Sequence, residues 1–269
     1  MKLIERNQIK SSLNHICVLT VICFFVTQAF AQDPLKLLPH AYKLEFENDW
    51  VKVTRVHYAP HEKLPPHQHT QTASAYVYLN DGGPVVFNHI GHTNYPVTRR
   101  ETKAGAFRLY RALQEIHEVQ NLSDLPSDFL RVEIKTELVE DNTFGGRFYR
   151  VATPSGENLQ KTQFDDKQVR ITRLICASGK SLELTTSPTE PALLVALVPS
   201  DLKVYEGKGG FEKLKLEMGK TRWIAAGQQQ KFQNTGSEPA ELLRFDFKTK
   251  PLSKEALEKN KKDEHSKSE

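Results

Sequence analysis

The chain has 269 residues, 38% of them hydrophobic, with 37 Lys and Arg against 33 Asp and Glu. At ~100–200 residues per domain, this length allows one large domain or two small ones, with enough apolar material for a packed core. The composition therefore excludes a disordered chain and a small disulfide-stapled domain.

The first 31 residues have the layout of an export signal. Lys2, Arg6 and Lys10 precede an apolar run from Ile16 to Val26, and Ala29-Phe30-Ala31 supplies small residues for a cleavage site. This run is shorter than the ~20 residues that a membrane-spanning helix needs. We expect an exported protein, periplasmic or secreted, with no integral membrane segment after removal of the signal.

Removal of the signal changes the charge and the cysteine content. Three basic residues and one acidic residue leave with it, so the remaining net charge is only about +2, which gives no electrostatic reason to expect a nucleic-acid partner. Cys176 stays as a single cysteine and can form no internal disulfide. Because residues 161–249 around it contain no histidine to activate it, we expect a buried, inert thiol.

The remaining chain repeats itself. Residues 50–59 (WVKVTRVHYA) match residues 168–177 (QVRITRLICA), and residues 130–136 (LRVEIKT) match residues 243–249 (LRFDFKT). The alternation of apolar and polar residues in these segments is typical of half-buried strands. The offset falls from 118 to 113 between the two matches, so the second copy lacks five residues in its middle.

Each repeat divides into short β-rich runs separated by turn signals such as Asn80-Asp81-Gly82-Gly83, with no long amphipathic helix. This pattern predicts an all-β sandwich or barrel for each copy.

Three histidines in the first copy have the spacing of a metal site. His67 and His69 are two residues apart after Pro65-Pro66, so on a strand both side chains point to the same face. A third histidine, His117, follows Gly105. Neutral imidazole is a good ligand for Zn, Fe, Cu and Ni.

These residues resemble the two motifs of the cupin superfamily. The first motif has two His separated by one residue, usually a Glu a few residues later, and then a Gly; the second has a Gly, a His and an Asn four positions further on. The matching residues here are Pro66-His67-Gln68-His69, Gly82, Gly105, His117 and Asn121. The resemblance implies an all-β fold of two tandem cupin-type jelly-roll β-barrels, a bicupin.

The domain boundaries follow from the repeat and this resemblance. We predict a signal peptide at 1–31, an N-terminal cupin barrel at 32–138, a linker at 139–160, a degenerate C-terminal cupin barrel at 161–250 and a disordered charged tail at 251–269.

Two departures from the family pattern shape the predicted site. The usual carboxylate ligand falls near Ala73-Ser74-Ala75, where no carboxylate stands. The resemblance therefore implies that His67, His69 and His117 form a three-histidine set for one divalent transition metal, Fe, Mn, Zn, Ni or Cu, similar to the minority of cupins that includes thiol dioxygenases. A three-histidine set would equally hold Zn with one open position.

The second copy departs further. His117 aligns with Gln230, and the two-histidine motif aligns with residues 183–187, which contain no histidine, whereas Asn121 aligns with Asn234. The second barrel is expected to be a structural partner or an apolar ligand pocket. Since the Asn persists where the ligands are lost, it is expected to hold a turn.

Other residues of the first copy have alternative roles. Tyr76 and Tyr78 lie on one face of a predicted strand, where they line the pocket or belong to the core of the sheet. His89 and His92 follow a glycine turn, and we expect them in an exposed loop, from which one of them could approach the site.

Two functions remain open at this point. The first is an exported metal-binding cupin that acts on a small molecule as an oxygenase, an isomerase or a hydrolase. The second is a non-catalytic, extracytoplasmic binding protein for a sugar-like ligand, with a relic metal site. The sequence also leaves open whether the protein is a homodimer.

Overall fold

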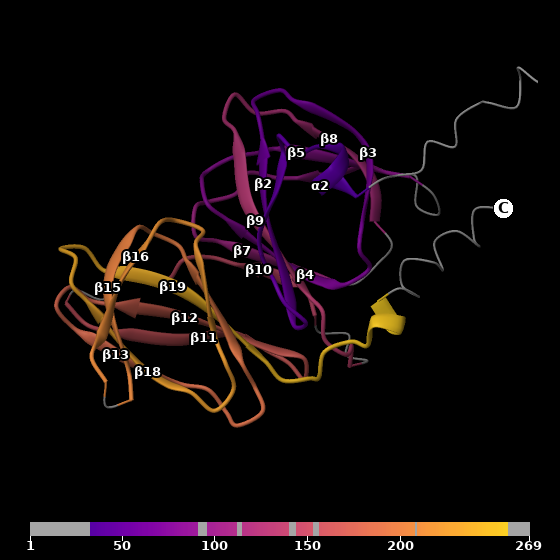
Figure 1. Ribbon diagram of the computed structural model, residues 1–269. Coiled ribbons are helices and arrows are strands. Elements are labelled where there is room, and N and C mark those ends of the chain that lie inside the picture. Colours follow the sequence, from indigo (N-terminus) through magenta and orange to yellow (C-terminus); the bar gives the residue numbers. More distant parts are fainter. Residues whose placement is uncertain are drawn as a thin grey trace, which may run out of the picture. The chain divides into compact units, whose positions relative to one another are not determined.

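The computed structural model describes residues 33–90, 96–111, 115–139, 144–152, 156–207 and 209–257. The predicted signal peptide and His92 lie outside the described residues. Regular structure within them consists almost entirely of strands, which form two barrels along the chain (Figure 1).

The N-terminal barrel is made of two sheets. A six-stranded sheet has the order β1-β2-β9-β4-β7-β10, and a four-stranded sheet has the order β3-β8-β5-β6. One helical turn, α2, precedes them. The elements are α2 (Pro34–Leu37), β1 (Tyr42–Glu47), β2 (Val51–Tyr58), β3 (Lys63–His69), β4 (Ala73–Tyr78), β5 (Val85–His89), β6 (Pro96–Arg99), β7 (Phe107–Tyr110), β8 (Glu115–Asn121), β9 (Ser127–Ile134) and β10 (Gly146–Phe148).

The C-terminal barrel repeats this arrangement. Its sheets have the orders β11-β12-β19-β14-β17 and β13-β18-β15-β16, which match the N-terminal orders strand for strand except for β10. The elements are β11 (Leu159–Asp165), β12 (Val169–Cys176), β13 (Ser181–Thr185), β14 (Ala192–Ala196), β15 (Ser200–Glu206), β16 (Phe211–Leu216), β17 (Thr221–Ile224), β18 (Gln229–Asn234) and β19 (Ala240–Phe247). The all-β, two-barrel architecture predicted from the sequence is confirmed.

Two segments outside the repeats are more structured than expected. The predicted linker at 139–160 contains β10, which pairs with β7 and extends the larger N-terminal sheet. The described part of the predicted disordered tail is ordered, because Pro251 bridges to Thr136 and residues 254–257 form a helical turn. Ser253 caps this turn by accepting a hydrogen bond from the amide of Ala256.

Buried side chains form three clusters. Two of these clusters fill the barrel interiors, one in each barrel. The third lies between the larger sheets of the two barrels. Side chains alternate along each strand, so one face of a large sheet packs in its own barrel and the other face packs in the shared cluster. Aromatic side chains dominate part of the shared cluster: Phe46, Trp50, Trp223 and Phe247.

The contact between the barrels follows the repeat. Arg55 donates a hydrogen bond to the carbonyl of Met218, and its repeat partner Arg173 donates one to the carbonyl of Gly105. The strand registers make Gly105 equivalent to Gly219, which directly follows Met218, so the two carbonyls lie in the same turn of each barrel. The two barrels therefore meet through equivalent surfaces, as two subunits do across a twofold axis.

Among the described residues, no helix is both long and apolar enough to cross a lipid bilayer.

Candidate metal centre

A bulge in β3 sets the direction of the two nearby histidines. Leu64 pairs with Val119 and His67 pairs with His117, so β3 carries one residue more than β8 between these two pairs. The additional residue falls at Pro65-Pro66. Because proline cannot donate to the ladder, it is tolerated at a bulge, where pairing is interrupted.

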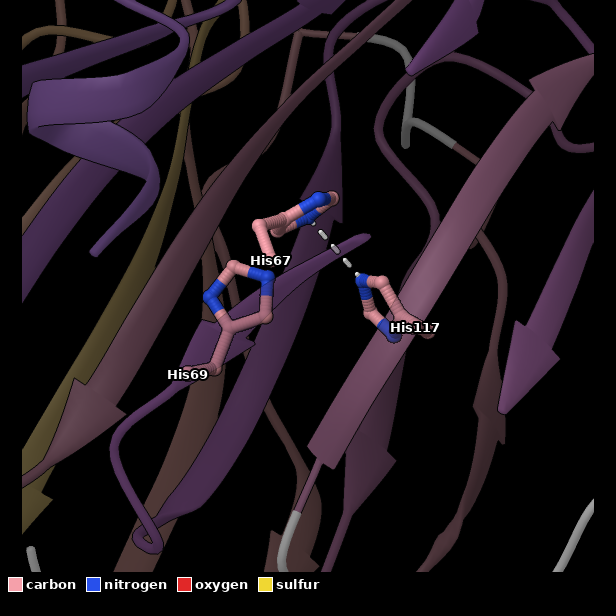
Figure 2. Close-up of side chains that lie close together, drawn as sticks. All are labelled: His67, His69 and His117. Carbon is pink, nitrogen blue, oxygen red and sulfur yellow. Dashed lines mark hydrogen bonds between the residues drawn. The ribbon is translucent and has the colours of Figure 1, made fainter. Parts of the chain in front are cut away.

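The structure brings the three predicted histidines together inside the N-terminal barrel. Their exposed fractions are 0% for His67, 6% for His69 and 1% for His117. Their rings lie 4.7–5.1 Å apart by centroid, and one nitrogen of each lies within 4.8 Å of the others (Figure 2). Among the described residues, this is the group of His, Cys, Asp and Glu that could hold a metal ion.

Hydrogen bonds define which nitrogen of His67 faces the group. Nδ1 lies 2.9 Å from the carbonyl oxygen of Pro65, which can only accept, so Nδ1 carries the proton. Nε2 of the neutral ring is then an acceptor, 3.2 Å from Nε2 of His117 and 2.8 Å from the hydroxyl of Tyr42. Bonding of the outer nitrogen to a carbonyl is the usual arrangement of a metal-ligating histidine.

The donor set fits a transition metal. Metal–nitrogen bonds are about 2.0–2.1 Å long, so two nitrogens on one tetrahedral ion lie about 3.4 Å apart. The observed 3.2 Å between the Nε2 atoms of His67 and His117 is close to this value. The group that the described residues form consists of histidines alone, and the buried Glu133 pairs with Lys52 and Arg131.

Tyr42 and Tyr58 belong to the site although sequence reasoning missed them. The Tyr42 hydroxyl lies 2.8 Å from both Nε2 of His67 and the hydroxyl of Tyr58, and all three side chains are buried. The ring of Tyr42 also lies 5.7 Å from that of His69. No motif signals this contact, because β1 precedes the histidine strand and belongs to the other sheet of the barrel.

His89 is not in an exposed loop as predicted. It is half-buried at the end of β5, opposite His117 in the register, with the two rings 5.7 Å apart. Phe87 on the same strand lies 5.1 Å from the ring of His117. The prediction was wrong because the residues that follow the glycine turn form β5, which pairs with β8 as far as His89.

Tyr76 and Tyr78 are buried on β4 and pack in the interior cluster of the N-terminal barrel. The hydroxyl of Tyr76 accepts a hydrogen bond of 2.8 Å from the guanidinium of Arg131. The core interpretation of these tyrosines is therefore confirmed, and both rings also form part of the interior that surrounds the histidines.

The second barrel has no equivalent donors. Leu182 pairs with Phe232 and Leu184 pairs with Gln230, with no bulge between them. By this register Leu184 and Gln230 take the places of His67 and His117. Both are buried, and Leu184 packs in the apolar interior of the second barrel.

The expected structural role of Asn121 is confirmed. Its amide donates to the carbonyls of Ala59 and Leu125, and its carbonyl accepts from the amide of Ser123. Asn234 bonds in the same way to Glu238 and Gly236, and it donates to the carbonyl of Cys176, the repeat partner of Tyr58, whose carbonyl also accepts from Asn121. Each Asn therefore ties the end of one strand to a turn, independently of any metal.

Cys176 is buried, as expected, and burial raises the pKa of its thiol. The thiol donates to the carbonyl of Lys180. A raised thiol pKa opposes nucleophilic reactivity, so the cysteine is structural.

Comparison with known proteins places this architecture. No protein-family model and no curated protein sequence matches the chain. Among solved structures, an oxalate decarboxylase from Lactobacillus farciminis in a formate complex has a TM-score of 0.54 and 13% identity, over 78% of this chain and 85% of that one. AerE from Microcystis aeruginosa has a TM-score of 0.51 and 14% identity, and the match covers 77% of this chain and 97% of AerE. A cupin 2 conserved barrel domain protein from Leptotrichia buccalis has a TM-score of 0.48 and 15% identity, and the match covers 77% of this chain and 88% of that protein.

The likenesses to the oxalate decarboxylase and to AerE support, at the level of the fold, the resemblance seen in the motifs. The chain has the cupin fold in its two-barrel form, a bicupin, and its N-terminal barrel contains a histidine triad that could bind a metal.

Proposed function

We propose that this protein is an exported bicupin that binds one divalent transition metal through His67, His69 and His117 and acts on a small organic molecule. The observation that carries the proposal is the convergence of three buried imidazoles, one of which has its outer nitrogen bonded to a carbonyl.

A metal in this site would supply Lewis-acid chemistry, which suits isomerisation or hydrolysis, and a redox-active ion such as Fe would also suit oxygenation. The protein's own residues would bind and orient. The carbonyl of Pro65 holds the ring of His67 in one tautomer. The hydroxyl of Tyr42 is hydrogen-bonded to that of Tyr58, and it places a hydrogen-bonding group beside Nε2 of His67, the nitrogen that would ligate the metal. Phe87 shields the ring of His117 from water.

A second candidate is a non-catalytic binding protein for a sugar-like ligand, with the histidines as a relic. The replacement of His67 and His117 by Leu184 and Gln230 in the second barrel favours it, since the described residues of that barrel contain no group that could hold a metal ion. The two candidates differ in whether the first barrel takes up metal.

The test is metal content. The chain is purified, stripped of metal, and reconstituted with Fe, Mn, Zn, Ni or Cu, and bound metal is measured by elemental analysis. We expect one ion per chain, and none in the triple variant His67→Ala, His69→Ala, His117→Ala. The double variant His40→Ala, His57→Ala is the matched control, because both histidines are exposed in the same barrel. Equal metal in the wild type and the triple variant would refute the proposal.

Export is tested separately. The full chain is expressed in a bacterium, the cells are fractionated, and the mass of the exported product is measured. We expect a product that begins near Gln32 outside the cytoplasm. A full-length product confined to the cytoplasm would refute export and leave the metal proposal intact.

A further inference from the structure

A small cleft lies at the side of the N-terminal barrel, lined by β7, β10 and the segment that follows β6. Its charged lining is strongly basic, with a single carboxylate: Arg99, Arg100, Lys103, Arg108, Arg147 and Glu101. The whole chain carries nearly equal numbers of basic and acidic residues. The charged residues of the cleft are therefore more basic than those of the chain as a whole.

Two arginines of the cleft stand directly opposite each other. Arg108 on β7 pairs in the register with Arg147 on β10. Like charges in this position repel and destabilise a sheet. No described side chain forms an ion pair with either of them, whereas the nearby Lys103 pairs with Asp81. The fold thus holds two guanidinium groups together without an acidic partner from the described residues.

Arg108 is not on a fully solvated face. Its neighbours on β7, Phe107 and Leu109, pack in the cluster shared by the barrels, so alternation turns Arg108 toward the other side of the sheet. Burial, followed by repulsion from Arg99 and Arg147, holds the pKa of Arg108 below its usual value. An anion between these groups would offset both costs.

Ring stacking holds the two strands of the cleft, β7 and β10, together. Phe148 on β10 stacks on Phe107, with ring centroids 4.6 Å apart and an interplanar angle of 13°. This stacking fixes β10 on β7 and so holds Arg147 opposite Arg108. A preformed pair of guanidinium groups binds planar oxyanions through two parallel hydrogen bonds each.

We propose that this cleft is a binding site for a small oxyanion, a carboxylate or a phosphate, with Arg108 and Arg147 as its principal donors. The site needs no metal and is distinct from the histidine triad.

A second, smaller hollow lies beside the cleft. It shares Tyr78, Arg99 and Arg100 with the cleft and reaches Tyr58 and Phe87. Those two residues contact Tyr42 and His117, respectively. An oxyanion in the cleft would therefore lie near residues that contact Tyr42 and the triad. Its role as part of a substrate rests on the proposed metal function, whereas its binding does not.

The experiment measures anion binding to the full, metal-free chain by isothermal titration calorimetry at about 0.15 M NaCl, where non-specific attraction to surface charge is screened. The probes are inorganic phosphate, benzoate and succinate, which distinguish a phosphate site from a carboxylate site. The variants are Arg108→Gln and Arg147→Gln. The matched control is Arg170→Gln, which removes an exposed arginine paired with Asp165 in the other barrel.

We expect saturable binding of at least one probe to the wild type and the control, and at least tenfold weaker binding to both cleft variants. Because Arg147 is exposed, its variant should fold, and removal of one like charge should keep or raise the Tm in anion-free buffer. Equal binding by all four proteins, or no saturable binding to the wild type, would overturn the proposal. Since every titration uses metal-free protein, failure of the metal site would not affect the result.

Discussion

Arg173 is the most deeply buried charge in the contact between the barrels, and its replacement by methionine tests how the barrels are coupled. Its exposed fraction is 0%. The guanidinium donates to Glu241 at 2.5 Å, to the carbonyl of Gly105 at 2.6 Å and to Gln163 at 2.8 Å. Burial lowers its pKa, and Glu241 opposes that shift. The variant Arg173→Met keeps an unbranched side chain but leaves Glu241 and the carbonyl of Gly105 without these bonds.

The magnitude follows from what is left behind. Breaking a buried ion pair by removing one partner costs about 3–5 kcal/mol, because the other charge stays buried. Arg150 still pairs with Glu241, which places the expected loss in the lower half of this range, about 3–4 kcal/mol. The repeat-related Arg55 is more exposed, with 27% of its side chain accessible, and pairs with Glu45. Solvent screening reduces the expected cost of Arg55→Met to about 1 kcal/mol.

The assay is equilibrium unfolding in urea for the wild type, Arg173→Met, Arg55→Met and the double variant Arg173→Met, Glu241→Leu. The midpoint and the slope of each transition give the free energy of unfolding. The double variant should recover most of the loss, since no buried charge is left alone. A loss below 1 kcal/mol for Arg173→Met, or a larger loss for Arg55→Met, would refute the reasoning.

Three further predictions concern the metal site and the acid stability. Tyr42→Phe removes a hydrogen bond that a metal must displace from His67, so metal affinity in a chelator competition should rise about twofold to tenfold; a fall would show that Tyr42 assists binding. Because ligation needs neutral imidazoles with a reference pKa of ~6.5, metal affinity should weaken as the pH falls below about 6, and constant affinity to about pH 4.5 would contradict the histidine ligands. Burial raises the pKa of Glu45, but Arg55 and Lys220 outweigh it and hold this pKa below its ordinary value of 4.5. The stabilisation is complete above the ordinary value and is lost as the pH falls through the lowered one. Glu45→Gln should therefore lose less stability than the wild type in acid unfolding between about pH 5 and pH 3, and parallel curves would contradict this.

The sequence predicted those parts of the site that depend on local spacing. Two residues on one strand face follow directly from the period of a β-strand, which is why His67 and His69 could be assigned to a common face. His117 could be added because its motif resembles a known family. The repeat predicted the loss of the site in the second barrel, and the persistence of Asn234 identified a turn.

Other parts of the site depend on contacts that no local pattern records. Tyr42 reaches His67 across two different sheets. His89 was misplaced because the end of β5 is decided by its pairing with β8. Arg147 stands opposite Arg108 because a segment expected to be a linker forms β10.

The sequence by itself determined the two-barrel fold, the three histidines and the barrel that contains them, because alternation, repetition and motif spacing are properties of neighbouring residues. The tertiary structure alone decided which tyrosine meets the histidines, which arginines line the basic cleft and how Arg55 and Arg173 join the barrels. These contacts arise from strand register and sheet packing, in which residues far apart in the chain are brought together by burial of the surfaces between them.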